Sequence, residues 1–341
     1  MIARTSRLAR FMLIISVSIL LLSPVCVAGK SVLIKIATLA PEGSSWMETF
    51  NTLKTEIMQK TEQNVQFRIY AGGVLGDEKD MLRKLHIGQI HGAVLTSSGL
   101  SALYGEIDVL QIPFLFQTYG EVDHVLDKMN TFFRKGFEDN GYVLLGWSEA
   151  GFVRLMSTTP VASLNDLKKM KVWTWEDAPL SRAIFDEAEV SAIPLTVPDV
   201  LVGLQTGLVD VVYAPPAGAI SLQWFTRVKY LTDVPLTYLV GAVVIKKNVF
   251  SQIPPVYQSA ISESFRLHLG KLKTIIRNEN QEALRVMEKH GVKIIKPSQD
   301  AVEEFMKLSD KAVQRLGAVS FSPKTRDDVS AYLKEYRDNK K

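Results

Sequence analysis

Between residues 31 and 95, segments with the apolar pattern of a strand alternate with segments with the apolar pattern of a helix. Residues 31–39 are mostly apolar or β-branched and carry Lys35 as their only charge, which predicts a buried strand. A Ser45-x-x-Glu48 capping box precedes a helix with one apolar face. That face consists of Trp46, Phe50, Leu53 and Ile57. Further elements are expected at 65–70 (strand), 77–87 (helix) and 91–95 (strand). The alternation predicts a parallel sheet with crossover helices.

The second half repeats this pattern. Strands are expected at 142–147, 151–156, 171–175, 208–213 and 239–245. Helices are expected after a Ser163-x-x-Asp166 cap, at 178–187, 198–204 and 217–230, and from Pro255 to about Gly291. The resulting fold class is α/β, with two lobes between which the chain crosses more than once.

The first 28 residues are typical of a cleaved secretory signal. Three arginines precede an unbroken run of apolar residues and serines at 11–22, and small residues lead up to Ala28. A membrane anchor is disfavoured because the run is short for about 30 Å of hydrocarbon. Lipidation at Cys26 is a minor alternative. We therefore expect an exported, periplasmic protein whose mature chain has no cysteine and hence no disulfide.

Composition excludes several functional classes. The chain has 341 residues, 47% of them hydrophobic and 22% charged, as in globular proteins of about two domains. The segment 1–28 holds Arg4, Arg7, Arg10 and no acid, so the mature chain has 37 basic and 36 acidic residues. A body with formal charge +1 does not match a nucleic-acid binder.

No catalytic or cofactor motif stands at diagnostic spacing, so no enzyme activity, cofactor or metal is expected. Residues 146–150 nearly match a nucleophile elbow, but Ala150 replaces the required glycine. The five histidines are scattered. The nearby acids Glu149, Glu176 and Asp177 are interpreted as loop and cap residues rather than an acid–base pair.

Seven segments in a fixed order, between Ile34 and Ile294, identify a family resemblance. They are residues 36–43, 70–77, 88–89, 113–116 with Glu121, 151–154, 166–172 and 204–210. The chain resembles the dicarboxylate-binding (DctP-type) solute-binding proteins of tripartite ATP-independent periplasmic (TRAP) transporters. The resemblance implies a small-molecule solute and a membrane permease as partners, and no nucleic acid.

The resemblance also implies a two-lobed periplasmic binding protein that closes on its ligand by hinge motion. We expect a signal peptide at 1–28 and a first lobe at 29–150 plus about 240–270. The second lobe takes 151–239 plus about 285–341. A long helical segment at about 255–291 bridges the two lobes.

Two departures from the family change the expected ligand. The family clamps a carboxylate with an arginine at the position of Trp173, and indole offers a single N–H and no charge. Where the family has a glutamate and an asparagine, this chain has Tyr213 and Ala214. We therefore expect an amphipathic or organic-acid ligand, its apolar body against Trp173, Trp175 and Tyr213.

Four further residues complete the expected ligand-binding set. Arg154 matches an upstream family arginine and is expected at the polar end of the ligand, with an inter-strand salt bridge as its alternative role. Trp224 is expected at the pocket mouth or in the core. Thr96 ends a strand at a polar contact position of the family, and Glu42 is a candidate for the cleft rim.

Other functions stay open at this level. An exported α/β hydrolase or lyase would need an activated nucleophile or an acid–base pair. A solute sensor that reports to a receptor would share the fold and the binding site. The sequence favours the transporter component over both alternatives.

Overall fold

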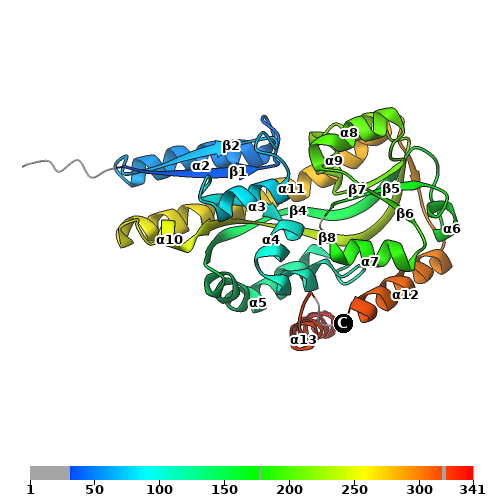
Figure 1. Cartoon of the computed structure of the whole chain (residues 1–341). Coiled ribbons are helices and arrows are strands. Elements are labelled where there is room, and N and C mark those ends of the chain that lie inside the picture. Colours follow the sequence, from blue (N-terminus) through cyan, green and yellow to red (C-terminus); the bar gives the residue numbers. More distant parts are fainter. Residues whose placement is uncertain (1–30, 177, 317–319, 341) are drawn as a thin grey trace, which may run out of the picture. The chain divides into compact units, whose positions relative to one another are not determined.

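A computed structural model describes residues 31–176, 178–316 and 320–340 (Figure 1). The predicted signal peptide and Asp177 lie outside the described residues. Residues from Val32 onward group into one unit. No helix among the described residues is both long and apolar enough to cross a membrane.

The fold is mixed α/β, as the sequence predicts. The strands are β1 (Val32–Thr38), β2 (Val65–Tyr70), β3 (Gly92–Thr96), β4 (Tyr142–Ser157), β5 (Lys171–Thr174), β6 (Ser191–Pro194), β7 (Val211–Ala214), β8 (Tyr230–Lys246) and β9 (Lys293–Ile295). The helices are α2 (Ser45–Lys60), α3 (Glu78–His86), α4 (Ser97–Leu103), α5 (Tyr119–Asp139), α6 (Leu164–Leu167), α7 (Pro179–Glu187), α8 (Val197–Thr206), α9 (Pro216–Ser221), α10 (Lys247–Phe250), α11 (Pro255–Lys289), α12 (Gln299–Leu316) and α13 (Pro323–Asp338). Two 3-10 helices are η1 (Gly105–Gln111) and η2 (Trp224–Thr226).

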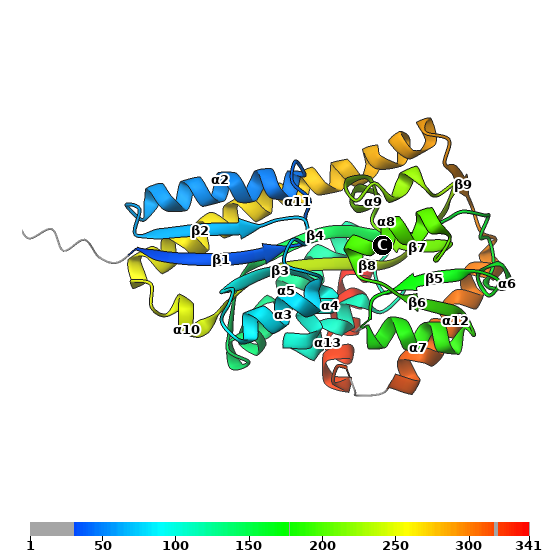
Figure 2. The ribbon, with the colours of Figure 1, turned by 45° about the horizontal axis from the view of Figure 1, so that its top comes forward.

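One sheet in the described residues runs in the order β2-β1-β3-β8-β4-β7-β5-β6, with β9 paired to β8 (Figure 2). The prediction of a parallel sheet is wrong for its centre. β8 pairs antiparallel with both β3 and β4, and β4 pairs antiparallel with β7. Parallel pairs flank this centre, β2-β1-β3 on one side and β7-β5-β6 on the other, and the short β9 also pairs in parallel with β8.

The long strands β4 and β8 connect the two flanks. The sequence predicts two strands, at 142–147 and 151–156, where the structure has the single strand β4. In the structure Gly151 has φ +115° and β4 continues through register shifts near positions 145, 150 and 154. Such bulges bend a strand without ending it. A Cβ atom at Gly151 would lie 2.5 Å from the side-chain nitrogen of Asn280 on α11, so glycine is required here.

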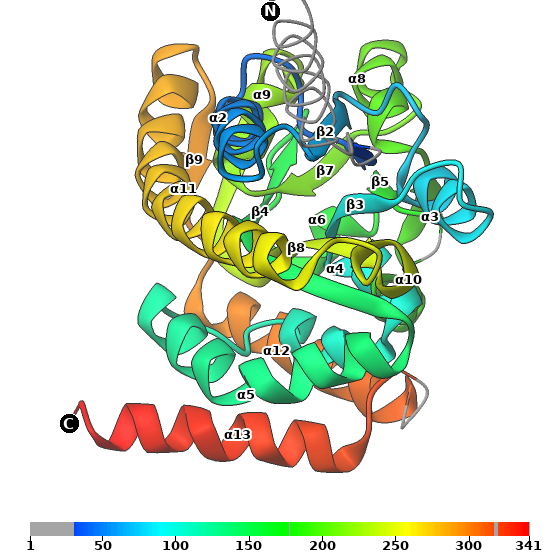
Figure 3. The ribbon, with the colours of Figure 1, turned by 90° about the vertical axis from the view of Figure 1, so that its left-hand side faces the viewer.

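Helices cover the sheet on both faces (Figure 3). α11 packs against β4, α2 and α9, and α5 packs against β4 and α13. α11 is one continuous helix of 35 residues, as predicted for 255–291. The apolar face predicted for α2 is buried as expected.

Two local predictions are wrong. The N-cap of α2 is Ser44, whose hydroxyl accepts from the Met47 N–H, so the capping box predicted from Ser45 does not form. The helix predicted over 217–230 ends early, because Gln223 takes the left-handed conformation with φ +60°. η2 follows Gln223, and β8 already begins at Tyr230.

Candidate functional site

Five aromatic residues line a cavity of about 140 Å³, here called the aromatic cavity. They are Trp46, Trp173, Trp175, Tyr213 and Trp224. The other lining residues are Thr38, Leu39, Ala40, Pro41, Glu78, Val94, Leu95, Thr96, Ser148, Glu149, Ala150, Val197, Ala214, Pro215, Gly218, Ser221, Leu222, Leu239, Val240 and Gly241. A dry cavity of about 150 Å³ admits benzene, so the space suits a ligand with one small ring or a short chain.

Trp173 is the centre of the aromatic wall. Its ring centroid lies 4.8 Å from that of Trp175, 5.0 Å from Tyr213 and 5.1 Å from Trp224. The indole N–H of Trp173 donates to the Leu195 carbonyl at 2.9 Å. With its one donor used and its side chain fully buried, Trp173 offers a ligand apolar surface only.

Short strands set these rings side by side. β5 and β7 are parallel neighbours, with Val172 opposite Val211, and Trp173 of β5 and Tyr213 of β7 both line the cavity. Trp175 follows the last residue of β5, and Trp224 stands in η2 directly after the turn at Gln223. Trp224 is both core and cavity wall, being 2% exposed.

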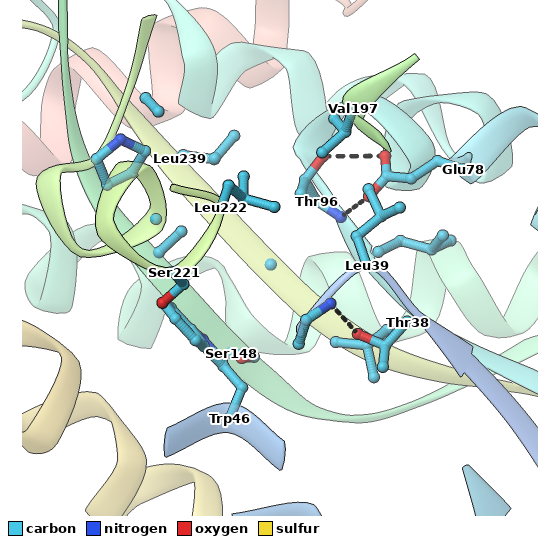
Figure 4. A pocket seen from close by; sticks show the side chains of 18 of the residues that line it. Thr38, Leu39, Trp46, Glu78, Thr96, Ser148, Val197, Ser221, Leu222 and Leu239 are labelled. Carbon is cyan, nitrogen blue, oxygen red and sulfur yellow. Dashed lines mark hydrogen bonds between the residues drawn. The ribbon is translucent and has the colours of Figure 1, made fainter. Parts of the chain in front are cut away.

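The polar side of the cavity is built around Glu78 of α3. Its carboxylate accepts from the Thr96 N–H at 2.5 Å, the Thr96 hydroxyl at 2.9 Å and the Gly99 N–H at 2.8 Å. Figure 4 shows Thr96 and Glu78 joined in this way, with Trp46, Ser148 and Ser221 across the cavity. Burial raises the pKa of Glu78 to about 7 despite these three donors.

The raised pKa predicts a loss of stability with rising pH. Folded Glu78 holds its proton more tightly than the unfolded side chain, so the free energy of unfolding falls between about pH 4.5 and pH 7. The span corresponds to a few kcal/mol at about 1.4 kcal/mol per pH unit. In Glu78→Gln this part of the slope should vanish in urea titrations across that range. An unchanged slope would contradict the assignment.

Asp77 links two helices at the edge of the same cavity. Its carboxylate accepts from the Glu78 N–H at 2.8 Å, which caps α3, and from the Val197 N–H at 2.9 Å, at the start of α8. An exposed ion pair of 3.3 Å joins Lys79 of α3 to Glu176, which follows β5. One carboxylate thus stabilises two helix N-termini that lie 120 residues apart in sequence.

Glu149 of the cavity lining belongs to a partly buried ion-pair network. Arg277 of α11 donates to Glu149 on β4 at 2.7 and 2.9 Å and to Asp123 of α5 at 2.8 and 2.7 Å. The Tyr238 hydroxyl also donates to Glu149. Burial by itself lowers the pKa of Arg277, but the two carboxylates hold it above its usual value. Glu149 thus lines the cavity while its charge is balanced by the guanidinium of Arg277.

The described lining of the aromatic cavity contains acids but no lysine, arginine or histidine. Arg154 does not line it; its guanidinium donates to Asp233 on β8 at 3.0 Å, the alternative role given by the sequence. The neighbouring Val153 lines two adjoining cavities. Glu42 is exposed and follows Pro41 of the lining, which is a rim position.

The structure thus brings together five of the seven predicted residues: Thr96, Trp173, Trp175, Tyr213 and Trp224. The sequence did not reveal Trp46, Glu78 or Glu149 as parts of the site. Trp46 belongs to the predicted apolar face of α2, and it is both core and lining. Glu149 was read as a loop acid. The one available signal for Glu78 is that it directly follows the family segment that ends at Asp77.

The described residues hold no cluster of three or more side chains suited to a metal ion. Glu176, an acid considered for catalysis, pairs with Lys79 in a partly exposed contact and is not among the cavity lining.

Comparison with known proteins places the chain among bacterial solute-binding proteins. Residues 36–318 match the model of the bacterial extracellular solute-binding protein family 7. The 2,3-diketo-L-gulonate-binding periplasmic protein YiaO of Escherichia coli is 25% identical over 72% of this chain and 74% of that protein. The C4-dicarboxylate-binding periplasmic protein DctP of Rhodobacter capsulatus is 23% identical over 77% of this chain and 81% of that protein.

A solved structure shows the same fold. The sugar acid binding protein DctPAm of Advenella mimigardefordensis, in complex with galactonate, superposes with a TM-score of 0.83 at 19% identity. The alignment covers 90% of this chain and 99% of that one.

Proposed function

The chain belongs to family 7 of the bacterial extracellular solute-binding proteins and is a TRAP-type solute-binding protein, and we propose that it delivers its solute to a membrane permease. The protein would act in the periplasm, to which the segment 1–28 would direct it before being cleaved off. The observation that carries the proposal is the aromatic cavity, formed by parts of the chain from both flanks of the sheet.

The proposed mechanism is closure of two lobes around the solute. Residues 29–150 with about 240–270 would form the first lobe, and 151–239 with about 285–341 the second. β4, β8 and α11 run through both, and the bulged part of β4 around Gly151 is where bending would occur. The hydrogen bond from Val197 to Asp77 would exist only in the closed state, so it favours closure together with the ligand contacts.

The proposed solute is a small amphipathic compound or organic acid. The relatives named above bind a keto-sugar acid, C4-dicarboxylates or galactonate, and organic acids are the starting expectation for this chain. Trp173 and Tyr213 favour a larger apolar part than those ligands have. A carboxylate placed in the cavity would lack a cation in the described lining, which costs several kcal/mol.

Arg154 and Glu42 stay candidates for contact with the solute's polar end. For Arg154 this requires that its ion pair with Asp233 opens, and for Glu42 that the rim closes inward. Thr96 presents its hydroxyl to the cavity while bound to Glu78, and Trp224 would contact the apolar body together with Trp175. No observation in the described residues favours the hydrolase, lyase or sensor alternatives.

A thermal-shift screen tests the solute class. A hundredfold excess of ligand over its dissociation constant stabilises a protein by about 2.7 kcal/mol, which is readily detected. We expect aromatic and branched monocarboxylic acids to raise the melting temperature more than succinate or galactonate. Stabilisation by succinate with micromolar affinity, and none by the apolar acids, would contradict the proposed class while leaving the family assignment intact.

A further inference from the structure

A second cavity of about 80 Å³ adjoins the aromatic cavity and has a different character. It is walled by α4, η1, α7 and β8, and we call it the Asp108 chamber. Its polar lining consists of Ser98, Ser101, Asp108, Gln111, Ser181 and Thr237. Trp175, Tyr213 and Leu239 line both cavities, so they form the partition between them.

Asp108 is a buried acid that has no cationic partner among the residues of the structure's described ranges. Its side chain is 3% exposed, and it accepts from the Gln111 amide at 2.8 Å. The hydroxyls of Ser101 and Ser320 also lie near it, but no lysine, arginine or histidine pairs with it within the described residues. Among the other buried acids, Glu121 and Glu149 are paired with arginines, whereas Asp77 and Glu78 accept hydrogen bonds from backbone N–H groups. An unpaired buried carboxylate favours a hydrogen-bond donor as its neighbour.

A second, independent feature marks the partition. The hydroxyl of Tyr213 is buried and makes no hydrogen bond with another described residue. The hydroxyls of Thr174 and Ser181 lie near it without forming one. Buried polar atoms nearly always have a partner, and leaving one unsatisfied costs about 1–3 kcal/mol. Tyr213 therefore offers both a donor and an acceptor at the junction of the two cavities.

We infer that the Asp108 chamber is a second part of the solute site, which receives a hydroxyl or ammonium group attached to the apolar body held in the aromatic cavity. The group would donate to Asp108 and exchange a hydrogen bond with Tyr213. This inference rests on the proposed function, because it assumes that the apolar body occupies the aromatic cavity. It selects against a carboxylate at this end of the solute, since every ionisable side chain in the chamber lining and the aromatic-cavity lining other than Tyr213 is an acid.

Three probes of equal length test this chemistry. Phenylpropylamine, phenylpropanol and phenylpropionate share one ring and one three-carbon chain, and they end in an ammonium, a hydroxyl and a carboxylate. Calorimetric titration at neutral pH should give the tightest binding for the amine, weaker binding for the alcohol and the weakest for the acid. Tightest binding by phenylpropionate would overturn the inference.

Two variants place the effect in the chamber. Asp108→Asn should weaken binding of the amine by about tenfold, as expected for loss of a hydrogen bond to a charged group, and the alcohol by less. Tyr213→Phe should weaken both several-fold without lowering thermal stability, because its hydroxyl bonds no other described residue. Asp310→Asn, at an exposed position on α12, controls for the loss of one negative charge.

The outcomes separate this inference from the proposed function. If the probes bind in wild type and lose affinity in Trp173→Ala but not in Asp108→Asn or Tyr213→Phe, the chamber is not a subsite and solute binding in the aromatic cavity stands. If none of the probes binds at millimolar concentration while sugar acids or dicarboxylates do, both the chamber and the proposed apolar body are wrong.

Discussion

Trp173→Ala is expected to abolish solute binding and to lower the free energy of unfolding by about 3–5 kcal/mol, the usual range for truncating a large buried aromatic side chain. From sequence alone, a cavity position for Trp173 implied a loss of affinity much larger than the loss of stability. The structure changes this expectation, because Trp173 is fully buried and contacts three other rings while it lines the cavity.

A matched variant separates the two effects. Phe133 of α5 is equally buried but belongs to the core on the other side of β4, and it is not among the cavity lining. Phe133→Ala should lower stability by a similar amount and leave solute affinity unchanged at a temperature where both variants are folded. Urea unfolding and calorimetric titration give the two quantities. Equal affinities in the two variants would remove Trp173 from the site.

Arg277→Met should be the second large effect, with a loss of about 3–5 kcal/mol in the free energy of unfolding. The substitution leaves Glu149, whose side chain is 6% exposed, and Asp123 without their shared cation. The loss should fall mainly on the packing of α11 against β4 and α5, since Arg277 joins these three elements. Urea unfolding measures it.

A double variant identifies the cause. Arg277→Met combined with Glu149→Gln should be less destabilised than the sum of the two single variants, because the buried charge is removed with its partner. Lys135→Met is the control: its pair with Asp139 is exposed and should contribute at most about 1 kcal/mol. A loss below about 1 kcal/mol in Arg277→Met would show that the network does not hold these elements together.

Much of the fold follows from local pattern. The strand β2 and the long helix α11 lie where the hydrophobic period predicts them. The periodic pattern that specifies each of these elements is contained within its own residues. β4 and β8 are longer than predicted because pairing with each other carries them past Gly151 and through polar stretches. That pairing joins residues about ninety positions apart, and no local window contains it.

The candidate site was predictable where residue type was unusual. Trp173 and Tyr213 stand out in the sequence because the family resemblance leads one to expect polar residues at these positions, and both line the cavity. Arg154 has the right chemistry, but it lies at a register shift of β4, where Val153 lines the adjoining cavities and Arg154 pairs with Asp233. Glu78 and Asp108 look like ordinary surface acids in sequence, because their burial comes from α4, which packs against both α3 and η1.

Native mass spectrometry of the mature protein, purified without refolding, tests most directly whether the chain captures an amphipathic solute. The account predicts a co-purified compound that contains an apolar or aromatic body, retained by wild type and Phe133→Ala and lost in Trp173→Ala. A protein that carries no solute, and whose mass shifts only with small dicarboxylates or sugar acids in wild type and Trp173→Ala alike, would contradict it.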